Sequence, residues 1–229
     1  MITTPEQLRK QVSRGGNPYS LGFDGADDYV DSNYNVDLDS FSVSVWVKNA
    51  NAFGNKQAVT DKWGDWRVVG EDGTGEPWLD SGGLEFAVTN GDGDRIGCGW
   101  ETTQTGSWVH IVATYDSSTY DMKLYADNDL KDTNNTGGGR DYNDETVLVG
   151  VKNGLIGYFE GLIDDARIYN RALSADEIFK LYKGVLISQV GLVGYWPMDS
   201  GEGAIAYDKS GNGNDGDIIG ATWSEDTPL

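Results

Sequence analysis

The chain has 229 residues, with 37 acidic and 17 basic side chains and a formal net charge of −20. Such an acidic surface repels nucleic-acid phosphates and anionic membranes, so neither is expected as a partner. The single cysteine, Cys98, excludes an internal disulfide framework. No apolar run approaches the roughly 18 residues that a membrane-spanning helix needs.

The first residues predict a short helix. Thr4 suits the N-cap, Pro5 the first helical position, and Gly15-Gly16 the stop, which gives a helix over residues 4–13 within an N-terminal extension, residues 1–18. Residues 1–16 are polar and lack the apolar stretch of a secretory signal peptide. This helix is a candidate for self-association or for docking to a protein partner.

The rest of the chain has the pattern of an all-β protein. The sequence carries 32 Gly, 8 Trp and 12 Tyr, which suits many short aromatic-rich strands joined by turns. In residues 41–47, every second residue is apolar and belongs to one face of a strand: Phe41, Val43, Val45 and Val47. The opposite face carries Ser42, Ser44 and Trp46. No βαβ rhythm is present, which favours a sandwich of antiparallel sheets. Strands are expected near 20–31, 41–48, 57–62, 65–70, 83–90, 94–100, 107–115, 121–126, 146–151, 156–170, 192–198 and 216–223.

Residues 161–182 predict a strand, a sharp exit and one short helix near 174–183. Ser174 with Glu177 three residues later is a capping box. Ile178, Leu181 and Tyr182 then fall on one helical face. Asp164 and Asp165 interrupt the alternation of the strand, and packing alone does not explain two adjacent carboxylates there.

Five segments together resemble the laminin-G-like domains of the concanavalin A-like lectin/glucanase superfamily. They are the strand and helix just described, Ser20-Leu-Gly-Phe-Asp-Gly-Ala-Asp-Asp-Tyr-Val-Asp31, Phe41-Ser-Val-Ser-Val-Trp-Val47, the pair 108–116 and 122–125, and Gly191-Leu-Val-Gly-Tyr-Trp-Pro-Met-Asp199 with Ser210-Gly-Asn-Gly-Asn-Asp-Gly216. The resemblance implies a two-sheet antiparallel β-sandwich, a jelly roll, formed by residues 19–229 as one domain.

The order of these segments differs from the usual one in the family. There, the segment like residues 191–216 comes before the segment like residues 20–31, whereas here it follows the helix. A circular permutation would explain this, with residues 191–223 supplying the strands that usually come first. Alternatively, residues 191–229 open a second copy of the domain that is not completed.

Catalysis is not predicted. Glycosidases on this type of sandwich place carboxylates at alternate positions of one strand, about 5–5.5 Å apart in retaining enzymes. The sequence has no such spacing: Glu71, Asp72 and Glu76 lie in a Gly-rich stretch, and Glu85 has no acidic partner two residues away. The only histidine, His110, is interpreted as a satisfied strand residue. We therefore expect no enzyme activity and no facing carboxylates across a sugar-sized cleft.

The resemblance implies one structural Ca²⁺ ion, which prefers carboxylate and carbonyl oxygens. Carried over by motif, the candidate ligands are Asp24, Asp27, Asp164 or Asp165, and Asn212 or Asn214. The alternative is that Asp24 and Asp28 only build turns while Asp164 pairs with Arg167 or Arg171. The wider excess of Asp in loops has three open explanations: turn formation, Ca²⁺ binding, or adaptation to high salt.

Carbohydrate binding is the best-known use of the family. Trp63, Trp66 and Trp78 lie in or near Gly/Asp-rich segments and are the candidate sugar-stacking residues, whereas Trp46, Trp108 and Trp196 are assigned to the core. We expect a non-catalytic, lectin-like recognition or adhesion domain with a glycan or surface polysaccharide as partner, at a cell or virion surface. The alternatives are a purely structural assembly module and, less favoured, a glycoside hydrolase.

Overall fold

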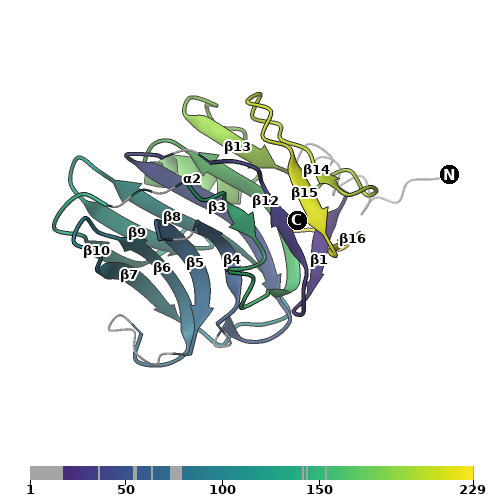
Figure 1. Ribbon diagram of the computed structural model, residues 1–229, viewed down its shortest axis with the longest axis horizontal. Helices are drawn as coiled ribbons and strands as arrows, with labels where there is room; N and C mark the ends of the chain where they lie inside the picture. Colours follow the sequence, from purple (N-terminus) through teal and green to yellow (C-terminus); the bar gives the residue numbers. More distant parts are fainter. Residues whose placement is uncertain are drawn as a thin grey trace.

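A computed structural model describes residues 18–35, 37–53, 56–62, 64–72, 79–140, 142, 144–152 and 154–228. Two antiparallel sheets stack face to face (Figure 1), which confirms the predicted sandwich. The helix predicted over residues 4–13 lies outside the described residues. Within the described part, no helix has the length and apolar character that crossing a membrane requires.

The first sheet, called sheet A, is built around a central ten-residue strand, β12. One edge of β12 pairs with β3, and the other edge pairs first with β1 and then with β13. The strands of sheet A, in spatial order, are β10 (Asp129–Asn135), β9 (Asp121–Ala126), β8 (Trp108–Asp116), β3 (Phe41–Asn49), β12 (Glu160–Tyr169), β1 (Ser20–Asp24) and β16 (Thr222–Ser224), with β13 (Leu192–Trp196) beside β12.

The second sheet, sheet B, also has eight strands. Its order is β14 (Ile205–Ala206), β15 (Gly216–Ile219), β2 (Tyr29–Asp31), β11 (Leu148–Val149), β4 (Ala58–Lys62), β5 (Trp66–Glu71), β6 (Gly83–Thr89) and β7 (Arg95–Glu101). The chain after residue 191 therefore contributes strands to both sheets, and in Figure 1 it lies beside β1 and β12.

The core lies between the two sheets. Phe41, Val43, Val45 and Val47 of β3 point into it, as the period-two pattern predicts. The opposite face of β3 is also buried, because helix α2 (Ala175–Tyr182) covers sheet A from outside. Ser174 caps α2 through the predicted capping box with Glu177. Ile178 and Leu181 of α2 are buried against sheet A.

Two predicted strands are each divided in the structure, and some strands lie outside the predicted ranges. The segment 20–31 forms two strands in different sheets, because the chain turns at Gly25, which has a φ of +81°. The segment 216–223 is likewise divided at Gly220, with a φ of +75°. Strand β10, Asp129–Asn135, was not expected, because its polar sequence DLKDTNN lacks an apolar face.

Candidate functional site

A cluster of three carboxylates stands where β1 ends. Asp24, Asp27 and Asp28 each offer an oxygen atom, and these atoms lie within 4.8 Å of one another. The turn is held by two hydrogen bonds: the Ala26 N–H donates to Asp24 Oδ1 at 2.8 Å, and the Asp24 N–H donates to Asp28 Oδ2 at 2.8 Å. Asp24 and Asp27 are exposed, whereas Asp28 is buried. The turn therefore fixes one buried and two solvent-facing carboxylates together.

The buried member of this acidic cluster, Asp28, has a shifted pKa. Burial raises the pKa of the Asp28 carboxyl; the N–H of Asp24 acts to lower it, and the neighbouring charges of Asp24 and Asp27 raise it further. A bound cation would oppose this effect by stabilising the charged form. The geometry and the charge both suit a hard cation with oxygen ligands.

Glu160 lies next to the acidic cluster from the neighbouring strand. It is the register partner of Asp24, and the Asn51 side-chain amide donates to its Oε2. Gly25 allows this approach, because a Cβ atom at residue 25 would stand 3.0 Å from the Glu160 Cβ. Sequence reasoning missed both Asp28 and Glu160 as candidate ligands. Asp28 is adjacent to a chosen residue, but the position of Glu160 depends on strand register.

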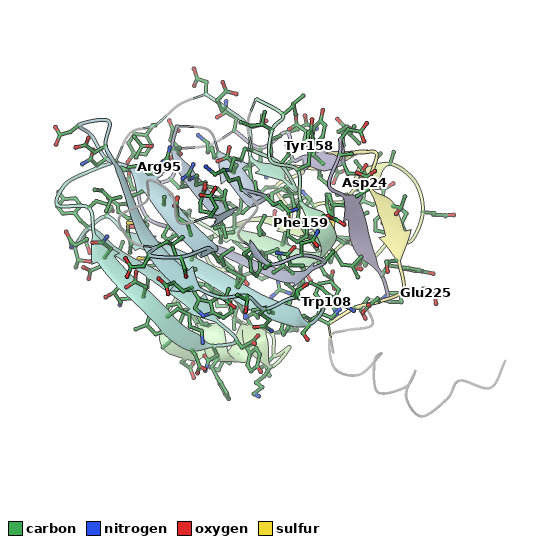
Figure 2. The ribbon with its side chains drawn as sticks, turned by 90° about the horizontal axis from the view of Figure 1, so that it is seen from below. Asp24, Arg95, Trp108, Tyr158, Phe159 and Glu225 are labelled. Atoms are coloured by element: carbon green, nitrogen blue, oxygen red, sulfur yellow. The ribbon has the colours of Figure 1, made fainter. Side chains whose placement is uncertain are left out.

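A shallow hollow adjoins the acidic cluster at the ends of β1, β3 and β12. Its volume is about 600 Å³. Among the residues that line it are Asp24, Asp28, Lys48, Asn49, Glu160 and Thr222. Figure 2 shows Asp24 and Glu225 at opposite ends of β1.

The other predicted metal ligands on β12 do not join the acidic cluster. Asp164 is fully buried opposite Trp46 of β3. Asp165 has a left-handed backbone with a φ of +55°, and its Oδ1 accepts from Arg167 at 2.8 Å. The irregularity that interrupts the pattern at these positions is a register shift between Asp164 and Arg167. It aims Asp165 at an arginine on its own strand.

The loop 208–214 holds β13 in place. The Asn212 amide donates to the carbonyl oxygens of Leu192 and Val193, and the Asn214 amide donates to Val193. Both side chains that were predicted as metal ligands therefore donate hydrogen bonds to the backbone of β13.

The Asp208 carboxylate accepts several of the hydrogen bonds that hold that loop. Its carboxylate accepts the backbone N–H groups of Tyr195, Ser210 and Asn214 at 2.8–3.0 Å. Burial acts to raise the pKa of Asp208, but the N–H donors of Asn214 and Ser210 outweigh it, and the pKa lies below its ordinary value.

The tryptophans are placed differently from the prediction in two cases. Trp66 is not a surface residue: it is 3% exposed and packs against Phe41, with 5.4 Å between ring centroids. Trp108, assigned to the core, is instead partly exposed, and its Nε1 donates to Asp226 Oδ1 at 2.9 Å. Trp63 and Trp78 lie outside the described residues. Trp46 and Trp196 are buried as expected.

Two carboxylates on neighbouring strands of sheet B pair with the same arginine. Glu85 and Glu71 both contact Nη2 of Arg67, at 2.7 and 3.3 Å. Lys152 also contacts Glu71, at 2.9 Å. The two residues are 0% and 3% exposed. Their oxygens are therefore paired with cations and closed to a substrate in this structure.

His110 is a buried strand residue, as interpreted from the sequence. Its Nε2 lies 2.8 Å from Ser44 Oγ, and its ring stacks on Trp46 with 5.0 Å between centroids. Tyr182 of α2 lies against the same stack. The Ser44–His110 pair is thus covered by the helix.

The fold and the sequence can now be compared with known proteins. The profile of the concanavalin A-like lectin/glucanases superfamily matches residues 24–179. The chain belongs to this superfamily. A solved structure of a Bacteroides ovatus ATCC 8483 protein, assigned as carbohydrate-binding, superimposes with a TM-score of 0.70 and 18% identity, over 90% of this chain and 59% of that one.

Two further comparisons are informative. Domain 4 of AbnA, a GH43 extracellular arabinanase from Geobacillus stearothermophilus solved with arabinotriose, has a TM-score of 0.53 and 20% identity, over 71% of this chain and 76% of that one. The N,N-dimethylformamidase beta subunit of Alcaligenes sp. is 21% identical over 213 residues, covering 77% of this chain. The chain spans only 27% of the length of that relative.

Proposed function

We propose that this chain is a non-catalytic, lectin-like recognition domain with a structural Ca²⁺ ion. The observation that carries the proposal is the acidic cluster of Asp24, Asp27 and Asp28, which adjoins a hollow at one end of the sandwich. Three carboxylates held this close repel one another unless a cation or a proton compensates them. Such a domain would act at a cell or virion surface.

Calcium suits the acidic cluster better than a transition metal. Ca²⁺ takes six to eight oxygen ligands at about 2.3–2.6 Å and tolerates irregular geometry. The acidic cluster contains only carboxylates, without the imidazole or thiolate that zinc prefers. Asp24, Asp27 and Asp28 would hold the ion, with Glu160 as a further carboxylate from the neighbouring strand.

The names of the related structures support sugar recognition. One is assigned as carbohydrate-binding, and another is a domain of an arabinanase in complex with arabinotriose. The absence of catalysis is supported by the burial of Glu71 and Glu85, whose carboxylates are paired with Arg67. A glycosidase needs a general acid and a nucleophile or base in reach of the substrate bond.

A glycan array read with Ca²⁺ and with EDTA tests the proposal. We expect retention of one class of glycan with Ca²⁺, and its reduction for Asp28→Asn. Asp92→Asn is the matched control, because Asp92 is an exposed carboxylate in the β6–β7 turn. Release of reducing ends from polysaccharides, lost on mutation of Glu71 or Glu85, would overturn the non-catalytic assignment.

A structural assembly module is the second candidate, and a separate observation favours it. After α2, Leu186 and Val190 are 90% and 73% exposed, and Val185 is half-exposed. Such neighbouring apolar side chains are typical of a surface that packs on another domain or chain. The dimethylformamidase subunit, much longer than this chain, contains a related segment within a larger protein. An empty glycan array, together with association lost in Leu186→Ser, would favour this candidate.

A further inference from the structure

Helix α2 turns a stripe of mixed chemistry away from the sandwich. Its buried residues, Ile178 and Leu181, face sheet A. The opposite side carries residues spaced i, i+3, i+4 and i+7, which share one helical face. This stripe, called the α2 stripe, consists of Asp176, Phe179, Lys180 and Lys183. All of its members are at least partly exposed, and the Phe179 ring is 46% exposed.

The chain that follows α2 adds an apolar side chain next to the α2 stripe. Gly184, with a φ of +68°, ends the helix, and its N–H donates to the Leu181 carbonyl at 3.0 Å. The N–H of Val185 donates to the Lys180 carbonyl at 2.8 Å. This pair of bonds is a Schellman motif, in which the residue at the position of Val185 commonly packs on the last turns of the helix. Val185 is thereby fixed near Phe179.

Arg171 fixes the other end of the segment 185–190. Its Nε donates to the Val190 carbonyl at 2.9 Å, and its two terminal nitrogens donate to Glu177, in the first turn of α2. The segment therefore begins at the last turn of α2 and ends beside the first turn, so it runs back along the helix. Leu186 and Val190 project from it into solvent. Apolar side chains held in place before binding need little further ordering.

The charge of this surface differs from that of the rest of the chain. Residues 171–198 carry three basic and two acidic side chains, and residues 178–198 contain neither Asp nor Glu, although the whole chain has a net charge of −20. Two copies of so acidic a chain repel each other where their carboxylates face one another. At this surface the repulsion is small, so two copies can approach each other here.

We propose that the α2 stripe and the segment 185–190 form the contact surface of a homodimer, with the two α2 helices antiparallel about a twofold axis. The α2 stripe has its carboxylate, Asp176, at the N-terminal end and Lys183 at the C-terminal end. An antiparallel pair places Asp176 beside Lys183 of the partner subunit, and it places Phe179 near the axis. It also sets the positive end of each helix dipole beside the negative end of the other. The surface is therefore complementary to itself.

The contacts within one chain leave these charges accessible. Asp176 pairs with Lys180 at 2.6 Å, but the two side chains are 69% and 44% exposed and can reach a second chain. Lys183 lies over the rings of Phe179 and Tyr182, and within the described residues it forms no ion pair. The apolar part of the surface is small beside a standard interface of roughly 20–30 residues a side, so we expect a weak dimer. This inference rests on the second proposed function, the assembly module, and names its partner as another copy of the chain.

Sedimentation velocity over about a hundredfold range of protein concentration tests the proposal. The wild-type mass should rise from monomer to dimer across the range. Leu186→Glu places a carboxylate in the contact surface and should weaken the association about tenfold or more. Ile156→Glu is the matched control and should not weaken it, because Ile156 is 59% exposed in the connection between β11 and β12. Both changes affect exposed side chains, and the melting temperature checks that each variant folds.

An exchange of charges tests the antiparallel arrangement. Lys183→Glu and Asp176→Lys should each weaken the homodimer about tenfold, because each variant places like charges at both symmetric contacts. An equimolar mixture of the two variants should associate as tightly as the wild type, since the exchanged charges then attract each other. A mixture that associates no more tightly than either variant alone would contradict the antiparallel pairing.

The remaining outcomes separate the inference from the proposed functions. A wild-type chain that stays monomeric over the whole range would overturn the inference, while the glycan array still decides the lectin-like function. If the wild type dimerises but neither Leu186→Glu nor the two charge variants weaken the dimer, the contact lies elsewhere. The inference would then be wrong and the assembly module would stand.

Discussion

The Asp28 carboxylate accepts a hydrogen bond from the backbone N–H of Asp24, with 2.8 Å between the nitrogen and Oδ2. This bond folds the turn back over the end of β1 and brings the three carboxylates of the acidic cluster together. The turn and the candidate metal site are therefore one local structure. A test of the metal has to separate loss of the turn from loss of the ion.

Ca²⁺ is expected to raise the melting temperature. An ion that binds only the folded state stabilises it by about 2.7 kcal/mol at one hundred times its dissociation constant. Asp27→Asn should abolish the Ca²⁺-dependent shift, because Asp27 belongs to the acidic cluster without a role in the two turn bonds. Asp164→Asn and Asp165→Asn should retain it. A melt unchanged by EDTA, with no calcium by elemental analysis, would contradict the metal site.

The Ca²⁺-dependent stabilisation should weaken in acid. Burial raises the pKa of Asp28, so this carboxyl takes up its proton at a higher pH than an ordinary aspartate. Protonation removes a negative charge that the cation needs, and metal affinity falls as pH is lowered. Calorimetric titration of Ca²⁺ at several pH values between 4 and 7 measures the effect. A Ca²⁺ affinity independent of pH over this range would exclude Asp28 as a ligand.

Sequence reasoning predicted the two-sheet sandwich but not all of its edge strands. The apolar alternation of β3 and the Ser174–Glu177 capping box carry enough local information to place a core strand and a helix. Strand β10 has no such signal, because most of its residues are exposed. It is a strand because its backbone pairs with β9. Backbone pairing is independent of side-chain pattern, so polar edge strands escape detection.

The candidate site was predicted only in part, because strand pairing brings together residues that are far apart in the sequence. Asp24 and Asp27 lie in one short turn, so the sequence alone brings them together. Glu160 reaches Asp24 only through the pairing of β12 with β1, which residue spacing does not reveal. Asn212 and Asn214 were chosen by motif, yet their amides bind the backbone of β13. The role of an Asn depends on which carbonyl the fold places opposite it.

Glu177 should stabilise the protein at neutral pH and lose this effect in acid. The Arg171 guanidinium contacts both of its oxygens, at 2.7 and 2.9 Å, and lowers the pKa of Glu177 from 4.5 to about 2. Because the folded-state pKa is depressed, the contribution is complete above about pH 4.5 and disappears as pH falls toward 2.

Urea denaturation of Glu177→Gln at several pH values checks this prediction. Gln can keep the capping-box hydrogen bond but loses the charge that pairs with Arg171, so the free energy of unfolding should fall by about 0.5–1 kcal/mol at pH 7, and the difference from wild type should shrink near pH 2. Asp176→Asn is the control: Asp176 pairs with Lys180 on an exposed helix face, where such pairs contribute only about 0.2–0.5 kcal/mol. An equal loss at both pH values would mean that packing, not charge, explains the effect.

The block after residue 191 should be indispensable for folding. Trp196 of β13 is 1% exposed in the core, and its Nε1 donates to the Asn214 carbonyl at 2.7 Å. Trp196→Ala should therefore destabilise the protein by about 3–5 kcal/mol, measured by chemical denaturation. Trp223→Ala, which removes a partly exposed ring from β16, is the matched control and should cost less.

Deletion of residues 191–229 tests the same point for the whole block. It would remove β13, β15 and β16, and so expose the edges of β12, β2 and β1 that they pair with. Unpaired edges and a core without Trp196 should prevent cooperative unfolding in a calorimetric scan. If the truncated chain still melts cooperatively at the wild-type temperature, the block is not part of the folding unit. The circular permutation suggested by the segment order would then be wrong, since a permuted domain depends on the strands that the block supplies.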